Sequence, residues 1–176
     1  MRAQRRLLSI LTPGLLLAST SATTFVAPRF DAPSNAQEAP AACTLLTAAD
    51  ASTALEQKSQ PGKEFAGPTS CMWSADPAMS DSSRKVGVNT HSVEEFKLAQ
   101  HPKNMPITVE PVSGIGDEAF YEIYPNSQSP FIWVRKGNTA FSIRILTRVK
   151  PKPPFSLDQE KSKDAVLAKA AVAKLK

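Results

Sequence analysis

The chain has 176 residues and a formal net charge of +5, with 21 basic and 16 acidic side chains. It contains only two cysteines and two histidines, so few of the usual ligands of a metal site or members of a catalytic set are present. Neither a Gly-x-Ser-x-Gly elbow, nor a phosphate-binding glycine loop, nor a dinucleotide fingerprint occurs, so no common enzyme class is indicated.

Residues 1–22 have the three-part layout of a secretory signal peptide. A basic start at 1–6 is followed by an apolar run at 7–19 and by small residues that end at Ala22. The run is shorter than the roughly 20 residues of a membrane span, so we predict cleavage, after Ala22 or Ala27, and no transmembrane anchor. The arginine pair in the start matches a twin-arginine signal poorly, which favours general secretion. The expected location is periplasmic or secreted.

Two further segments follow the predicted signal. Residues 23–41 are rich in Pro, Ala and small polar residues, and we expect a disordered leader there. Residues 42–176 have the size of a single globular domain. Charge is uneven, since residues 23–133 hold 13 acidic and 7 basic groups, whereas 134–176 hold 3 acidic and 11 basic groups. This asymmetry indicates either an anion-binding end or two halves of one fold that attract each other, and we favour the second.

The first half of the domain contains a helix and two predicted strands. Thr47 followed by Asp50 is an acidic capping box, which predicts a helix from Ala48 that Pro61-Gly62 ends. We expect strands over 69–74 and 85–89.

A second helix and two more strands follow. Ser92 and Glu95 have capping-box spacing and predict a helix that runs to about Gln100. Strands are expected over 107–112 and 119–124.

The clearest pattern is a β-hairpin over 131–146. Gly137-Asn138 separates two strand-forming runs and predicts a two-residue turn. The resulting register pairs Lys136 with Thr139, Val134 with Phe141, and Ile132 with Ile143. With the strand at 119–124 it predicts a three-stranded meander.

A final helix is predicted from the cap residue Ser156 to about Leu175. Its apolar stripe would consist of Ala165, Ala168, Val172 and Leu175. The expected fold class is therefore α+β: an antiparallel sheet of about five strands, with a C-terminal meander, three packed helices and one disulfide.

The two cysteines are predicted to form a Cys43–Cys71 disulfide, because exported chains meet oxidising conditions. A redox centre is the alternative, but its cysteines are usually two residues apart beside a helix start.

Two groups of residues are candidates for binding. Asp117 and Glu118 follow Gly114-Ile-Gly116 and bind either a cation or polar ligand, or the exposed backbone donors of a tight turn, which we favour. The outer face of the meander offers aromatic rings beside guanidinium groups, a combination that binds glycans, peptides or anions unless a helix covers it, as we expect. Its candidate ligand-binding residues are Phe120, Tyr124, Phe131, Trp133, Arg135 and Arg144.

Four short motifs resemble the bacterial secreted and lipoprotein-type family called domain of unknown function 3558, over about residues 42–148. The resemblance implies an exported α+β domain with a bridged cysteine pair and carries no established activity or catalytic residue. The chain differs in lacking a lipidation cysteine and in having Glu56 where a glycine often ends the first helix. The motifs, in chain order, are Cys43-Thr-Leu-Leu-Thr47, Cys71-Met-Trp73, Gly114-Ile-Gly-Asp-Glu-Ala119 and Val134-Arg-Lys-Gly-Asn138.

These observations favour a non-catalytic exported domain that binds an envelope protein, a wall component or a small ligand. No catalytic residue, metal or cofactor is assigned, and no nucleic-acid partner is expected. One alternative is a small secreted hydrolase that uses His91 or His101, although surface or capping positions are favoured for both. Another is a binder of anionic polymers through residues 144–176.

Overall fold

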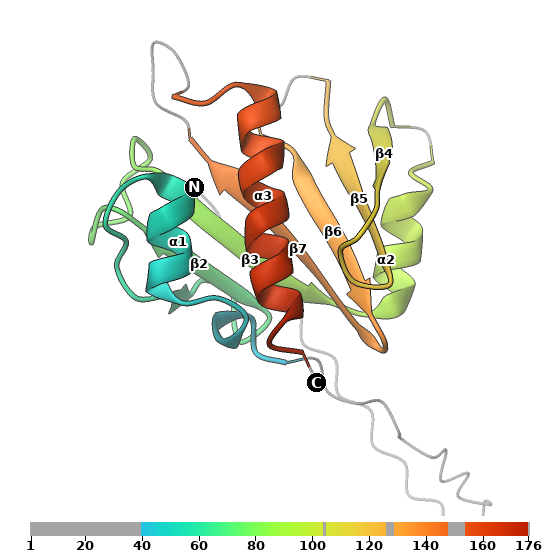
Figure 1. Cartoon of the computed structure of the whole chain (residues 1–176), viewed down its shortest axis with the longest axis horizontal. Helices are drawn as coiled ribbons and strands as arrows, with labels where there is room; N and C mark the ends of the chain where they lie inside the picture. Colours follow the sequence, from blue (N-terminus) through green and yellow to red (C-terminus); the bar gives the residue numbers. More distant parts are fainter. Residues whose placement is uncertain (1–39, 104, 126–128, 148–153, 176) are drawn as a thin grey trace, which may run out of the picture. The chain divides into compact units, whose positions relative to one another are not determined.

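A computed structural model of the chain describes residues 40–103, 105–125, 129–147 and 154–175 (Figure 1). The predicted signal peptide at 1–22 lies outside these ranges, as does the predicted leader at 23–41 except for Pro40 and Ala41. Among the helices of the described ranges, none is both long and apolar enough to cross a membrane.

The described residues form an α+β fold around one sheet of seven antiparallel strands, in the order β1-β2-β3-β7-β6-β5-β4. The prediction of about five strands was too low. Six of the strands correspond to segments that were each expected, and the one not expected is β1, which has only two residues and therefore no alternating pattern. The strands are β1 (Lys63–Glu64), β2 (Ser70–Ser74), β3 (Lys85–His91), β4 (Thr108–Val112), β5 (Glu118–Ile123), β6 (Phe131–Lys136) and β7 (Thr139–Leu146).

The hairpin register is the predicted one. Lys136 pairs with Thr139, and the pairs Val134–Phe141 and Ile132–Ile143 follow. Gly137 has the positive φ angle of 58° that a tight hairpin turn requires. On its other side β7 pairs with β3, which connects the meander to the N-terminal strands.

Three α-helices begin where the sequence predicts them: α1 (Ala48–Leu55), α2 (Val93–Gln100) and α3 (Leu157–Val172). Each has a complete capping box, in which the cap hydroxyl accepts the third backbone N–H and the third side chain accepts the cap N–H. The end of α1 differs from the prediction. Glu56 adopts a left-handed conformation (φ 54°) and ends the helix before Pro61-Gly62 is reached.

Side chains alternate between two cores on opposite faces of the sheet. α1 and α3 cover the larger core, which contains Val88, Ile132 and Ile143 (Figure 1). On the other face, Phe96 of α2 packs with Phe120 and Ala140. A short 3₁₀ helix, η1 (Ala42–Thr44), lies beside β2 and β3.

The predicted Cys43–Cys71 disulfide is present and joins η1 to β2. Its Cα atoms are 5.0 Å apart, within the usual range. Cys71 is buried next to Trp73 in the larger core, which we call the main core. The bridge therefore fixes the N-terminal end of the described chain to the sheet.

The buried stripe of α3 differs from the predicted apolar one. Ala168 is buried as expected, whereas Ala165, Val172 and Leu175 are only half-buried. All three still pack against the core, so the predicted stripe faces the sheet but was incomplete, because it counted only apolar side chains while the helix also turns two carboxyl groups toward the sheet. The fully buried residues of α3 are Glu160, Asp164, Leu167, Ala168 and Ala171.

The uneven distribution of charge along the sequence produces ion pairs between the two parts of the domain. Lysines of the basic C-terminal region pair with acids from the first part of the domain: Lys161 with Glu110 at 2.6 Å, Lys163 with Glu56 at 2.6 Å, and Lys174 with Asp50 at 3.3 Å. These pairs favour the interpretation that the two halves attract each other.

Candidate functional site

The face of the sheet that carries α2 contains, beyond the helix, a row of half-buried or exposed residues. Met72, Gly87 and Arg144 are direct cross-strand neighbours on β2, β3 and β7, and Arg144 also contacts Phe131 of β6. Together with Tyr124 at the end of β5, these residues define what we call the open face. Their counterparts on the opposite side of the same strands are fully buried in the main core.

A cation and two aromatic rings meet on the open face. The guanidinium of Arg144 lies 4.4 Å from the centre of the Phe131 ring, within the range of a cation–π interaction. Tyr124 meets the same ring edge-on, with 6.1 Å between ring centres. The cluster thus presents an oriented positive charge beside an apolar surface.

Glu122 is a buried carboxylate that fixes this cluster from below. It is 6 % exposed, and its two oxygens accept hydrogen bonds from Trp133 Nε1 at 2.7 Å and from the Tyr124 hydroxyl at 3.0 Å. Partial burial, followed by the Glu122 hydrogen bond, raises the pKa of Tyr124 above its usual value. The tyrosine therefore stays protonated and held in place.

His91 also contacts Trp133, the residue whose indole N–H donates to Glu122. Its ring stacks on Trp133 with 4.2 Å between ring centres, and its Nε2 lies 2.9 Å from the Ser142 hydroxyl oxygen. Burial lowers the pKa of His91, against the opposing effect of the Glu95 carboxylate. A histidine beside a serine is the starting geometry of a hydrolase, but Ser142 is 2 % exposed, so its hydroxyl is covered.

The structure separates the six predicted ligand-binding residues. Tyr124, Phe131 and Arg144 lie together on the open face. Trp133 is half-buried between His91 and Phe120, and Phe120 itself is buried under α2. Arg135 lies at the opposite end of β6. The predicted covering helix therefore protects only part of the outer face.

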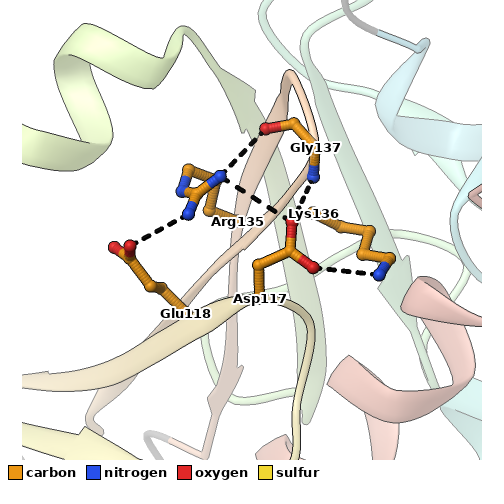
Figure 2. Close-up of polar contacts among 5 residues, drawn as sticks. All are labelled: Asp117, Glu118, Arg135, Lys136 and Gly137. Atoms are coloured by element: carbon orange, nitrogen blue, oxygen red, sulfur yellow. Dashed lines mark hydrogen bonds and ion pairs between the residues drawn. The ribbon is translucent and has the colours of Figure 1, made fainter.

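Arg135 belongs to a polar cluster with Asp117 and Glu118, drawn in Figure 2. One Asp117 oxygen accepts the Gly137 N–H at 2.7 Å and the other accepts Lys136 Nζ at 2.9 Å, while Arg135 Nη2 donates to Glu118 at 2.9 Å. The Gly137 bond, then the Lys136 bond, lowers the pKa of Asp117. Both acids are thus occupied in holding the hairpin turn.

A pocket of about 190 Å³ opens at the end of the open face. Sequence reasoning missed it, because its walls come from β3, β7 and the loop before β3, which only the sheet order brings together. Its lining residues are Asp81, Ser83, Lys85, Arg144 and Leu146.

Two candidates from the sequence remain, His101 and the basic C-terminal region. His101 is the exposed residue that ends α2, a capping position of the kind predicted. No cluster of three or more His, Cys, Asp or Glu side chains suited to a metal occurs among the described residues. Of residues 144–176, the proposed polymer-binding region, 148–153 and 176 lie outside the described ranges.

No protein-family model, no curated protein and no solved structure matches this chain. The resemblance drawn from its motifs therefore stays a prediction.

Proposed function

We propose that this chain is an exported, non-catalytic binding module that holds its ligand on the open face. The observation that carries the proposal is the Arg144–Phe131–Tyr124 cluster beside the pocket. Buried Glu122 holds Tyr124 from below, and the Arg144 guanidinium stacks on the Phe131 ring, so the cluster is ordered before a ligand arrives. Partners of such a surface include an envelope protein, a wall component or a small ligand.

Export forms the first half of the proposal. The Cys43–Cys71 disulfide is consistent with an extracytoplasmic location, since such bonds persist in oxidising compartments. Cell fractionation and N-terminal sequencing of the native protein test it. We expect the mature chain outside the cytoplasm, starting at Thr23 or Pro28. A cytoplasmic product with Met1 retained would contradict export.

Binding through the open face forms the second half. The Phe131→Ala and Tyr124→Ala variants remove the aromatic surface but leave both cores intact. We expect immobilised wild-type protein to retain specific components of an envelope extract, identified by mass spectrometry, and both variants to lose them. Phe65→Ala is the matched control, because Phe65 is an aromatic residue that is 73 % exposed. It follows β1, which forms one edge of the sheet, whereas Tyr124 follows β5, near the other edge.

The profile of retained components decides the outcome. If the wild-type protein and all three variants retained the same components, or if the Phe65→Ala control lost them equally, the open face would not be the binding surface.

A further inference from the structure

His91 joins β3 to α2. It is the last residue of β3 and directly precedes Ser92, the cap of α2. Its half-buried ring stacks on Trp133, and its Nε2 makes the only hydrogen bond that the Ser142 hydroxyl has among the described residues. Because Ser142 is buried, we assign the proton of the neutral ring to Nδ1, which leaves Nε2 to accept the hydroxyl proton of Ser142.

A positive charge on His91 does not suit this site. Protonation turns Nε2 into a donor, so the buried Ser142 hydroxyl loses the acceptor of its proton. Burial lowers the pKa of His91, because the charged ring loses solvation. The residue also stands at the N-terminal end of α2, where the positive end of the helix dipole disfavours a cation. The folded site therefore holds the neutral ring.

Few neighbours of His91 favour its charged form. The Glu95 carboxylate of α2 opposes the fall in pKa, but one of its oxygens already accepts the N–H of the helix cap, and the face of Trp133 also attracts a cation. The β7 residues opposite and diagonal to His91 are uncharged. Arg135 of β6 lies two strands away in an ion pair, and Glu122 of β5 accepts the indole N–H of Trp133. Burial outweighs these neighbours, since the pKa of His91 is lowered.

A short chain of contacts connects His91 to the open face. The ring of Trp133 packs on His91, and its indole N–H donates to Glu122 at 2.7 Å. The other Glu122 oxygen accepts the Tyr124 hydroxyl at 3.0 Å. If the His91 ring turns toward solvent, Trp133 loses the group that covers one of its faces. Because Glu122 is 6 % exposed, water does not readily replace the indole N–H, and a shift of this carboxylate also moves Tyr124.

We propose that His91 is an acid-sensitive positioning residue for the open face. At neutral pH its uncharged ring holds Trp133 and, through Glu122, keeps Tyr124 in place for the ligand. In mildly acidic surroundings the ring becomes charged and leaves Ser142 and Trp133, and the open face releases its ligand. Histidine is the side chain that responds in this pH range. This inference rests on the proposed function and adds its regulation by pH.

NMR titration of the mature, disulfide-bonded wild-type protein tests the coupling without any substitution. Between about pH 7.5 and about pH 5, the range in which histidine titrates, we expect His91 to titrate below a histidine peptide in the same buffer. The Trp133 indole N–H and the Tyr124 ring signals should change with the same midpoint as His91. The indole N–H of Trp73, which lies in the main core, should not follow it. Trp133 and Tyr124 signals that stay constant through the His91 midpoint would overturn the proposal.

Retention of envelope components at the same two pH values tests the effect on binding. We expect the wild-type protein to retain at least about fivefold less at the acidic pH, a coupling of ordinary size between two sites. His91→Gln offers Ser142 an acceptor but cannot become charged, so its retention should be nearly the same at both pH values. His101→Gln, at the exposed end of α2, is the matched control and should behave like wild type.

Comparing the variants at one pH cancels any titration of the ligand itself. An equal loss of components at acidic pH by wild type and His91→Gln would contradict the role of His91. If the wild-type protein retains no components at either pH, the proposed function fails, and the NMR titration still decides whether His91 controls Tyr124.

Discussion

Gly114 and Gly116 both have positive φ angles, 78° and 61°, but only Gly116 lies against another strand. A Cβ atom at Gly116 would be 2.5 Å from the Arg135 carbonyl oxygen, whereas one at Gly114 would meet nothing within 4 Å. We expect Gly114→Ala to lower the free energy of unfolding by about 1 kcal/mol, the penalty of the left-handed conformation. Gly116→Ala should lower it by about 3 kcal/mol, because overpacking is added. Urea denaturation of both variants measures the difference.

Equal losses in the two variants would contradict this account of the turn. The close approach also explains the position of Asp117, whose N–H donates to the Arg135 carbonyl at 2.8 Å while its carboxylate accepts the Gly137 N–H. Because Gly116 has no side chain, the turn can approach β6 closely enough for the Asp117 N–H to bond the Arg135 carbonyl.

At the scale of elements, the sequence predicts those features of a helix or strand that residues close together in the chain determine. The three capping boxes place the helix starts correctly, because a cap is made by residues three apart. The end of α1 was not predictable in this way, since Glu56 has a conformation that favours glycine. The predicted stripe of α3 was incomplete because hydrophobic periodicity assigns Glu160 and Asp164 to the solvent-exposed side, whereas both are 0 % exposed.

The buried Glu160–Asp164 pair predicts that the stability of the packing of α3 on the sheet depends on pH. Both Asp164 oxygens and Glu160 Oε2 are buried and lack a hydrogen bond of good geometry, although the backbone of Ile145 near Asp164 and the Ser129 side chain near Glu160 lower the pKa of these acids. Glu160 Oε1 accepts the Thr147 hydroxyl. Burial, and then the neighbouring Glu160 carboxyl, raises the pKa of Asp164 well above its usual value, and burial also raises the pKa of Glu160. The other charged group that acts on Asp164 is Arg144, and Tyr121 faces it from β5 with a pKa raised to about 12, mainly by burial.

The sign of the effect follows from these raised pKa values. Between the unfolded and the folded pKa of Asp164, the folded chain holds more protons, so the free energy of unfolding falls as pH rises through this window. Because an amide does not ionise, we expect Asp164→Asn to flatten this fall and to gain in stability relative to wild type as pH rises through the window. Urea denaturation at several pH values measures it, with Asp158→Asn in the exposed first turn of α3 as control. A wild-type stability that rises with pH in this window would contradict the prediction.

At the scale of the whole molecule, the open face was beyond sequence reasoning. Predicting it requires knowing that β3 lies beside β7, more than 50 positions later in the chain, because this pairing places Gly87 next to Arg144. The hairpin itself needed only its turn and its alternation. The six aromatic and cationic candidates were therefore assigned to the correct region of the meander, but not divided among the buried core, the turn cluster and the open face.

The Cys43–Cys71 bond acts on the whole molecule, because it closes a loop with a sequence separation of 28 that contains α1, β1 and the start of β2. Its loss gives the unfolded chain more conformations, so the Cys43→Ser, Cys71→Ser double variant should lose about 3.5 kcal/mol of the free energy of unfolding. A domain of this size is stable by about 5–15 kcal/mol, so the variant should remain folded at low temperature and melt well below wild type. Thermal and urea unfolding measure both effects, with reduced wild-type protein as the control that keeps both sulfur atoms. If reduction and double substitution left the stability unchanged, η1 would be held on β2 and β3 by packing alone.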